Sequence, residues 1–280
     1  MSHPWFRMSG MGRRLRSDIA GSWYHVFNRG VDRQPVFFCD RDRVEFERLL
    51  GVIADRYGVR VHAYCLMTNH YHLLLECPGG GLSDAMHDLT STFVRHVNER
   101  RGRDGPLFRG RFAAKPVLTS RYLRCLVRYI HRNPLAFCSL DEARRYRWGS
   151  HRIYDGSRAT PRWFASQHVL SMFESQAAFD SFVFGEAIVR TGGLGPAGWS
   201  DAIDLVIDEQ IADGSKQRLK TSVALLLLDR LDGTDRAEVA ATLEFPSAAA
   251  LRTARSRARR TLATRPELAR VVGGVLRLAA

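Results

Sequence analysis

The chain has 280 residues, of which 45% are hydrophobic and 25% charged, a balance typical of a folded globular protein. Its longest aliphatic run, Val223 to Leu228, is far shorter than the roughly 20 residues that span a bilayer. The N-terminus has no apolar stretch ending at a small-residue cleavage site. We therefore expect neither a membrane protein nor a secreted one.

Basic residues outnumber acidic residues by 42 to 29, a formal net charge of +13. Residues 1–150 carry 25 basic and 14 acidic side chains, net +11, whereas residues 151–280 carry 17 and 15, net +2. A basic front half is typical of proteins that bind nucleic acid, although solubility alone is an alternative explanation. The five cysteines are an odd number without CxxC spacing, which indicates thiols of a reducing compartment and a cytoplasmic protein.

The first 135 residues alternate between strand-like and helix-like patterns. Aromatic and β-branched runs predict strands, and apolar residues at helical spacing predict helices. In chain order we expect a strand at 22–28, a helix at 40–57 with Asp40 as a possible N-cap, strands at 59–67 and 71–77, a helix at 83–100, a strand at 112–118 and a helix at 120–133 that stops before Pro134. This order predicts an α+β fold, a ferredoxin-like antiparallel sheet flanked by helices.

The rest of the chain divides into two further regions. Residues 136–198 are expected to form an extension that ends in a Gly-rich linker, and residues 199–280 an all-helical region. Helices are predicted at 216–231, 234–243 and 247–264. The last two resemble a helix-turn-helix whose second helix carries the candidate DNA contacts Arg252, Arg255 and Arg259. A plain three-helix bundle with a solvated basic face is the alternative.

The run Asn69-His-Tyr-His72 carries the strongest local signal for chemistry. On a strand, side chains alternate, so His70 and His72 point to one face and Tyr71 to the other. Two neutral imidazoles at this spacing can hold one divalent metal, which needs a third ligand from elsewhere. The alternative is a pair of histidines at the surface or the edge of the core.

A second signal lies at the end of the helix before Pro134. Tyr129 and Asn133 are four residues apart and therefore share a helix face. A phenol can act as a nucleophile that forms a covalent intermediate, and the amide oxygen of Asn133 could be the third metal ligand. The alternative for Tyr129 is a helix tyrosine that packs on the sheet.

Four segments together resemble a known family. They are Tyr24-His-Val-Phe-Asn-Arg-Gly30, Ala63-Tyr-Cys-Leu-Met-Thr-Asn-His-Tyr-His-Leu-Leu-Leu75, Gly105-Pro-Leu-Phe-Arg-Gly-Arg-Phe112 and Arg128-Tyr-Ile-His-Arg-Asn-Pro134. The chain from about Gly21 to Pro134 resembles the IS200/IS605-type tyrosine transposases, the single-tyrosine branch of the HUH endonucleases. Within that family it is most similar to the REP-associated tyrosine transposases.

The resemblance implies a site and a reaction. His70 and His72 match the histidines of the HUH motif, Tyr129 matches the nucleophile, and Asn133 stands where the wider family usually has the longer glutamine. The resemblance implies that His70, His72 and Asn133 hold Mg²⁺ or Mn²⁺. The family's chemistry is cleavage of single-stranded, hairpin-forming DNA through a 5′-phosphotyrosine link, followed by strand transfer. Some relatives are monomers and others are dimers, and both states stay open for this chain.

Further side chains are candidates for holding the DNA. Phosphate contacts are expected from basic residues near the predicted site: Arg109, Arg111, Lys115, Arg128 and Arg132. Phe108 or Phe112 could stack on a base, but a buried core role is the stronger expectation for each. Two rival functions are a transposase-derived DNA-binding regulator that no longer cleaves, and a metal-dependent hydrolase that does not need Tyr129.

Overall fold

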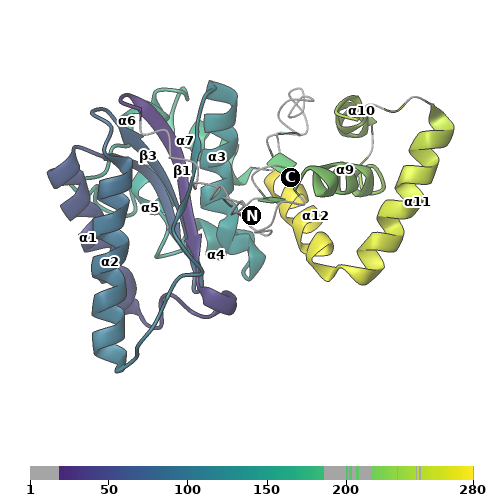
Figure 1. The fold of residues 1–280 in the computed structure, drawn as a ribbon. Coiled ribbons are helices and arrows are strands. Elements are labelled where there is room, and N and C mark those ends of the chain that lie inside the picture. Colours follow the sequence, from purple (N-terminus) through teal and green to yellow (C-terminus); the bar gives the residue numbers. More distant parts are fainter. Residues whose placement is uncertain are drawn as a thin grey trace, which may run out of the picture.

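The computed structural model describes residues 19–185, 200, 202–203, 206–207, 216–231, 233–243, 245 and 247–279. Its N-terminal part is a four-stranded antiparallel sheet in the order β2-β3-β1-β4 (Figure 1). The strands are β1 (Ser22–Arg29), β2 (Arg60–Leu66), β3 (His70–Cys77) and β4 (Ala113–Pro116). They are connected by the helices α1 (Asp40–Tyr57) and α2 (Leu82–Arg101) in the order β1-α1-β2-β3-α2-β4. The predicted ferredoxin-like fold is confirmed.

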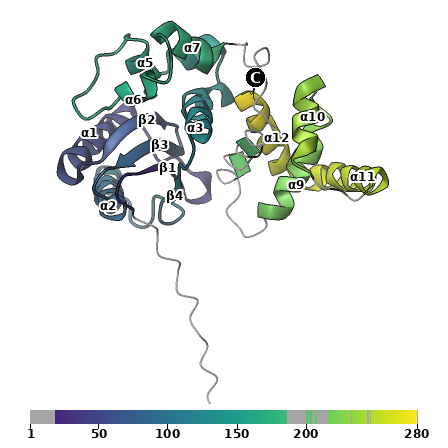
Figure 2. The same cartoon turned by 90° about the horizontal axis from the view of Figure 1, so that it is seen from above.

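Helices cover both faces of this sheet. The helices α1 and α2 pack against each other on one face, and α3 (Ser120–Arg132) packs on β2 and β3 from the other (Figure 2). The neighbouring residues Tyr71 and His72 of β3 point to opposite faces of the sheet. The ring of Tyr71 lies 4.9 Å from that of Phe46 in α1, whereas the ring of His72 lies 5.3 Å from that of Tyr129 in α3. Alternation along β3 therefore sends the two histidines of the motif to the α3 face.

The ends of α3 follow from its sequence. Thr119 caps the helix, because its side chain accepts a hydrogen bond from the backbone N–H of Tyr122 at 3.1 Å. Asn133 is the C-cap of α3, and Pro134 comes directly after it in the short 3-10 helix η2 (Asn133–Ala136). Leu126 and Ile130 are fully buried against the sheet. This packing fixes the direction in which Tyr129 points.

The beginning of α1 differs from the expectation. Its N-cap is Cys39, not Asp40, and a 3-10 helix η1 (Val31–Arg33) precedes it. The carboxylate of Asp42 accepts hydrogen bonds from the backbone N–H groups of Phe38 and Cys39, at 2.7 and 3.2 Å. The buried Asp42 thus provides the N3 half of a capping box with Cys39, and Asp40 is not the N-cap.

The extension after α3 packs on the β2 side of the sheet. It contains α4 (Leu140–Arg144), α5 (His151–Tyr154), α6 (Gln167–Leu170) and α7 (Gln176–Phe184). The backbone N–H of Leu66 donates to the carbonyl of Trp148, and that of Ala165 to the carbonyl of Val61, both at 2.9 Å. The extension thus covers the outer edge of β2, which would otherwise be open to pairing with another chain.

The C-terminal region is helical. Its elements are α9 (Lys216–Leu227), α10 (Gly233–Ala241), α11 (Ala248–Thr264) and α12 (Pro266–Ala279). The other three helices pack on α9, and α12 also contacts α3. The last helix, α12, was not predicted. The Gly-rich linker predicted at 192–198 lies outside the described residues. None of the helices described is both long enough and apolar enough to cross a membrane.

Candidate active site

The two histidines of β3 form the centre of the site. His70 and His72 are 8% and 0% exposed, and their ring centroids lie 5.2 Å apart with the planes nearly perpendicular. The Nδ1 atom of His70 is 2.7 Å from the side-chain oxygen of Asn69, and the Nδ1 atom of His72 is 2.9 Å from Nε2 of His25. Because Nδ1 of each ring already has a partner, Nε2 is the atom that each ring can offer to a cation.

His25 was missed by the sequence reasoning. It lies on β1 and is fully buried. Burial lowers its pKa well below the usual value, and the nearby His72 and Lys115 lower it further, so His25 is neutral at physiological pH. A neutral ring can accept the Nδ1–H of His72 and hold that ring in place. The motif around Tyr24 contains this histidine, but only the β1–β3 register shows that it lies behind His72.

The structure brings Tyr129 to the same place. Its side chain is 6% exposed, and the ring lies 5.3 Å from that of His72 and 6.2 Å from that of His25, edge-on to both. Asn133 follows one turn later, and its Nδ2 donates to the backbone carbonyl of Tyr129 at 2.9 Å. This bond uses the amide nitrogen of Asn133, so the amide oxygen is the atom that can serve as a ligand.

The donor set fits a divalent cation. Two imidazole nitrogens and an amide oxygen are acceptable ligands for Mg²⁺ or Mn²⁺, which keep water in their remaining positions. In the part of the chain that the structure describes, no cluster of three or more His, Cys, Asp or Glu side chains could hold a metal. The side-chain oxygen of Asn133 is the donor that the sequence predicted as the third ligand beside His70 and His72.

Two basic side chains lie on the same sheet face as the histidines. Lys115 on β4 pairs across the sheet with His25, and Arg29 on β1 pairs with His70. Arg29 is 7% exposed and was not predicted, since its position opposite His70 also depends on the register. The other predicted contacts, Arg109 and Arg111, are exposed on the segment that leads into β4. Positive charge therefore lies on β1 and β4, on the sheet face of the histidines, and on the segment that leads into β4.

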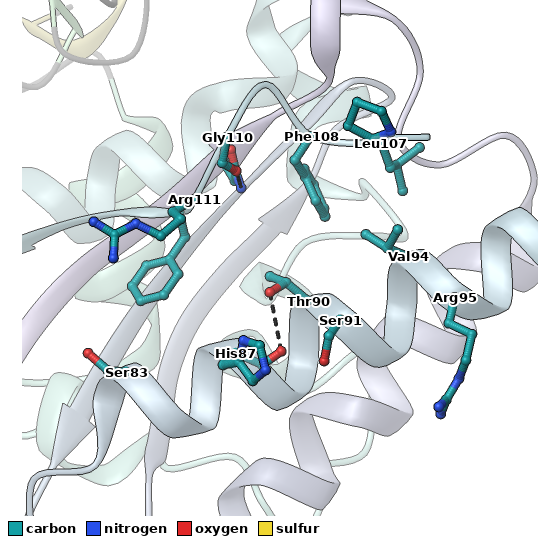
Figure 3. Close-up of a pocket in the computed structure, with 13 residues that line it drawn as sticks. Ser83, His87, Thr90, Ser91, Val94, Arg95, Leu107, Phe108, Gly110 and Arg111 are labelled. Carbon is teal, nitrogen blue, oxygen red and sulfur yellow. Dashed lines mark hydrogen bonds between the residues drawn. The ribbon is translucent and has the colours of Figure 1, made fainter. Parts of the chain in front are cut away.

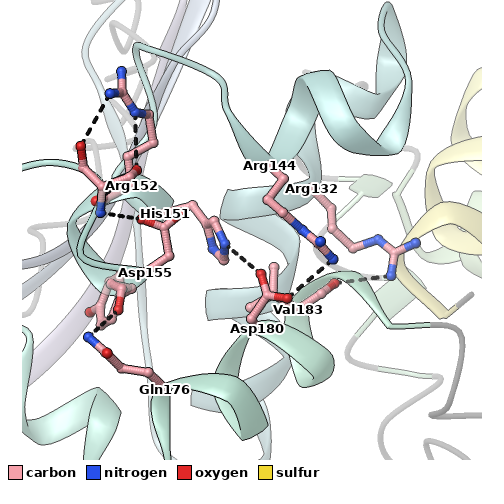
Figure 4. Close-up of polar contacts among 10 residues, drawn as sticks. Arg132, Arg144, His151, Arg152, Asp155, Gln176, Asp180 and Val183 are labelled. Atoms are coloured by element: carbon pink, nitrogen blue, oxygen red, sulfur yellow. Dashed lines mark hydrogen bonds and ion pairs between the residues drawn. The ribbon is translucent and has the colours of Figure 1, made fainter.

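Arg128 and Arg132 do not meet the expectation of a DNA contact. They are 1% and 8% exposed, and burial lowers the pKa of Arg128 to about 9 and that of Arg132 to about 10. Arg128 donates to the backbone carbonyl of Phe182 at 2.7 Å and Arg132 to that of Val183 at 3.2 Å, both near the end of α7 (Figure 4 shows the second bond). These arginines hold α7 against α3, which corrects their assignment as phosphate ligands.

We predict that Arg128→Ala lowers the free energy of unfolding by about 2–4 kcal/mol, since it removes a hydrogen bond from a charged donor and leaves a cavity. DNA affinity at a temperature where the variant is folded should stay within about twofold. Chemical denaturation and fluorescence anisotropy measure the two quantities. A large loss of affinity in a stable Arg128 variant would return this residue to the DNA interface.

The basic residues of α11 fall into two groups. Arg255 and Arg259 both bind the carboxylate of Asp229, which follows α9, and Nε of Arg259 lies 2.7 Å from it. The hydrogen bonds from Arg259, and to a smaller extent the one from Arg255, lower the pKa of Asp229 to about 2. Arg252, for which no such pair with Asp229 is found, is exposed on α11. Arg255 and Arg259 thus join α11 to α9, a structural role that sequence analysis did not foresee.

We predict that Asp229→Asn destabilises the C-terminal helices by about 1 kcal/mol at neutral pH, since the pair is partly exposed. The folded pKa lies below the usual value of about 4, so this contribution is present above pH 4 and is lost as the pH falls toward 2. Thermal unfolding followed by circular dichroism should show the difference between wild type and variant shrinking over that range. An unchanged difference at pH 2 would contradict the assignment.

Comparison with known proteins identifies the N-terminal part. The family model of IS200-like transposases matches residues 19–133. A solved structure of a REP-associated tyrosine transposase bound to a REP hairpin is similar at 16% identity, with a TM-score of 0.44, over 55% of this chain and 92% of that one. No curated protein matches the chain. The family match covers all four strands, both histidines, Tyr129 and Asn133. Over residues 19–133, therefore, the chain is similar to the IS200-like transposases.

Proposed function

We propose that the chain is a single-stranded DNA nickase and strand transferase that uses Tyr129 as its nucleophile. The observation that carries the proposal is the position of the Tyr129 ring, 5.3 Å from His72, on the sheet face that also holds His70. A buried tyrosine that served only packing would not need two histidines with fixed Nδ1 partners beside it. This arrangement favours the transposase over a regulator that has lost its site.

In the proposed reaction the phenolic oxygen of Tyr129 attacks a backbone phosphorus. The bond to the 3′ oxygen of the preceding nucleotide breaks, and a proton, in balance with the one that the phenol loses, is taken up by that oxygen. The products are a 5′-phosphotyrosine link and a free 3′-hydroxyl. A divalent cation at His70, His72 and Asn133 would supply Lewis-acid polarisation of a phosphate oxygen. Lys115 and Arg29 add positive charge near the phosphate. Attack by another 3′-hydroxyl on the phosphotyrosine reverses the chemistry, so joining needs no ATP.

We further propose that residues 199–280 contribute to DNA binding. The sequence of α11 contains no acidic residue, and Arg252, Arg257 and Arg260 are exposed on it. An exposed helix with arginines and hydroxyl side chains suits phosphate contacts on a duplex or hairpin. The resemblance to the REP-associated branch makes a DNA hairpin the first ligand to test. Both a monomer and a dimer are compatible with this role.

Labelled single-stranded oligonucleotides from the DNA that flanks the gene test the reaction. With Mn²⁺ or Mg²⁺ we expect a covalent protein–DNA band on a denaturing gel, and with EDTA we expect none. His70→Ala should remove the band while the protein still binds the oligonucleotide. Binding without any covalent product, on every substrate and with both metals, would favour the DNA-binding regulator.

A further inference from the structure

The turn that follows β1 has an unusual backbone. Asp32 and Arg33 have φ angles of 47° and 60°, in the left-handed region that residues other than glycine rarely adopt. Within the described part of the chain, no other non-glycine residue has a positive φ. Both side chains are exposed, so the burial of a side chain does not explain the conformation. Backbone strain of this kind persists only where the surroundings impose it, and it is concentrated at functional sites.

Neighbouring segments hold this turn, residues 30–34, on two sides. The backbone N–H of Gly30 donates to the carbonyl of Asn69 at 2.8 Å. The N–H of Val31 donates to the carbonyl of Leu107 at 3.1 Å, in the segment that faces α2 in Figure 3. A Cβ atom added at Gly30 would lie 2.1 Å from the carbonyl oxygen of Gln34, so only glycine permits this close approach. The path of the turn is therefore fixed.

The turn places one carbonyl group beside the metal site. The carbonyl of Arg33 accepts from Nδ2 of Asn69 at 3.0 Å, and Oδ1 of the same amide lies 2.7 Å from Nδ1 of His70. A backbone carbonyl can only accept, so the amide nitrogen faces Arg33 and the amide oxygen faces His70. The amide oxygen can also only accept, so a neutral His70 ring carries its proton on Nδ1. These two bonds leave the lone pair of His70 on Nε2.

A role in the connection between β2 and β3 is the simpler explanation for Asn69. Asparagine is common in tight turns because it tolerates the left-handed region. Asn69, however, is not one of the residues with positive φ. The connection therefore does not require asparagine for its backbone, whereas the two side-chain bonds require a group that has both a donor and an acceptor.

We propose that Asn69 and the turn 30–34 are positioning elements of the metal site, which fix the tautomer and the orientation of His70. The proposal rests on the function proposed above, in which Nε2 of His70 is a ligand of the divalent cation. His25 and Asn69 then have the same task at two rings, since each accepts the Nδ1–H of one histidine of the motif. An acceptor at Nδ1 orients a histidine ligand and makes its other nitrogen more basic.

Mn²⁺ titration of the full-length protein without DNA, followed by the electron paramagnetic resonance of the free ion, tests the role of Asn69. We expect Asn69→Ala to weaken Mn²⁺ binding about 10–100-fold. Asn98→Ala is the matched control, because Asn98 is also half-buried and its Nδ2 also donates to a backbone carbonyl, that of Gly105, at 3.0 Å. It should change the affinity by no more than about twofold. Equal affinity of the two variants would overturn the proposal.

Nitrogen-15 NMR of the metal-free protein at about pH 8, where an ordinary imidazole is neutral, reports the tautomer without any activity measurement. His70 should carry its proton on Nδ1 in wild type and in Asn69→Asp, whose carboxylate is still an acceptor. A mixture of tautomers should appear in Asn69→Ala. A proton on Nε2 of His70 in wild type, or a mixture in Asn69→Asp equal to that in Asn69→Ala, would contradict the proposal.

A pair of glycine variants tests the turn. Gly30→Ala places a methyl group against the carbonyl of Gln34, so it should shift the turn and produce the same mixture of tautomers at His70. Gly79→Ala adds its methyl group in open space and should not. An unchanged His70 tautomer in Gly30→Ala would remove the turn from the proposal.

His70→Ala separates this proposal from the proposed function. If it binds Mn²⁺ as wild type does, the proposed metal site fails. If it weakens binding and Asn69→Ala does not, only the role of Asn69 fails.

Discussion

Tyr129→Phe is expected to abolish the covalent protein–DNA product, with a loss of cleavage of at least about a thousandfold. The substitution removes one oxygen from a side chain that is 6% exposed and keeps its ring against His72. The fold and the affinity for uncleaved DNA should therefore stay close to wild type. A denaturing gel with end-labelled DNA measures the product, and anisotropy measures the binding.

Tyr122→Phe is the matched control. Tyr122 lies on the same helix, two turns earlier, and is 9% exposed. Phenylalanine keeps its ring and removes only the hydroxyl, as at Tyr129, and Tyr122 is not the proposed nucleophile, so we expect Tyr122→Phe to retain cleavage. Cleavage that survives in Tyr129→Phe without a covalent band would point to attack by water, as in the hydrolase alternative. Loss of cleavage in both variants would instead indicate damage to the packing of α3.

Patterns local in sequence predicted much of this molecule. The alternation of β3 correctly sent His70 and His72 to one face, and Pro134 correctly marked the end of the helix that carries Tyr129. These features depend on neighbours within a few residues, and the physical rules for them are local. The order of the seven N-terminal elements was sufficient to indicate the ferredoxin-like sheet.

Features set by distant contacts could not be predicted in the same way. His25 and Arg29 face the site only because β1 pairs with β3 in one particular register. Arg128 and Arg132 looked like surface cations beside a nucleophile, yet residues more than fifty positions later cover them. The acceptors are backbone carbonyls, which leave no compositional signal. Arg255 likewise depends on a distant partner, the carboxylate of Asp229, which follows α9.

His25→Leu is expected to weaken Mn²⁺ binding by about 10–100-fold, although His25 is not itself a proposed metal ligand. For His72 to offer the lone pair of Nε2, its proton must sit on Nδ1, and Nε2 of His25 at 2.9 Å is the acceptor for that proton. Leucine fills similar space but accepts nothing. The ring of His72 then loses both its preferred tautomer and its orientation. Titration of the uncleaving Tyr129→Phe protein with Mn²⁺, followed by the electron paramagnetic resonance of the free ion, measures the affinity.

A comparison of three variants separates positioning from packing. His25→Gln provides a side-chain oxygen near the place of Nε2, so we expect it to recover part of the affinity that His25→Leu loses. His131→Leu removes another buried histidine of low pKa, one that pairs with Ser150 at 2.8 Å and not with His72. It should lower stability without changing Mn²⁺ affinity. Nitrogen-15 NMR of the histidine rings reports the tautomer directly: His72 should carry its proton on Nδ1 in wild type and in His25→Gln, and a mixture of tautomers should appear in His25→Leu. If the proton sits on Nε2 of His72 in the wild-type protein, His25 is the donor and the proposed metal ligand at His72 is wrong.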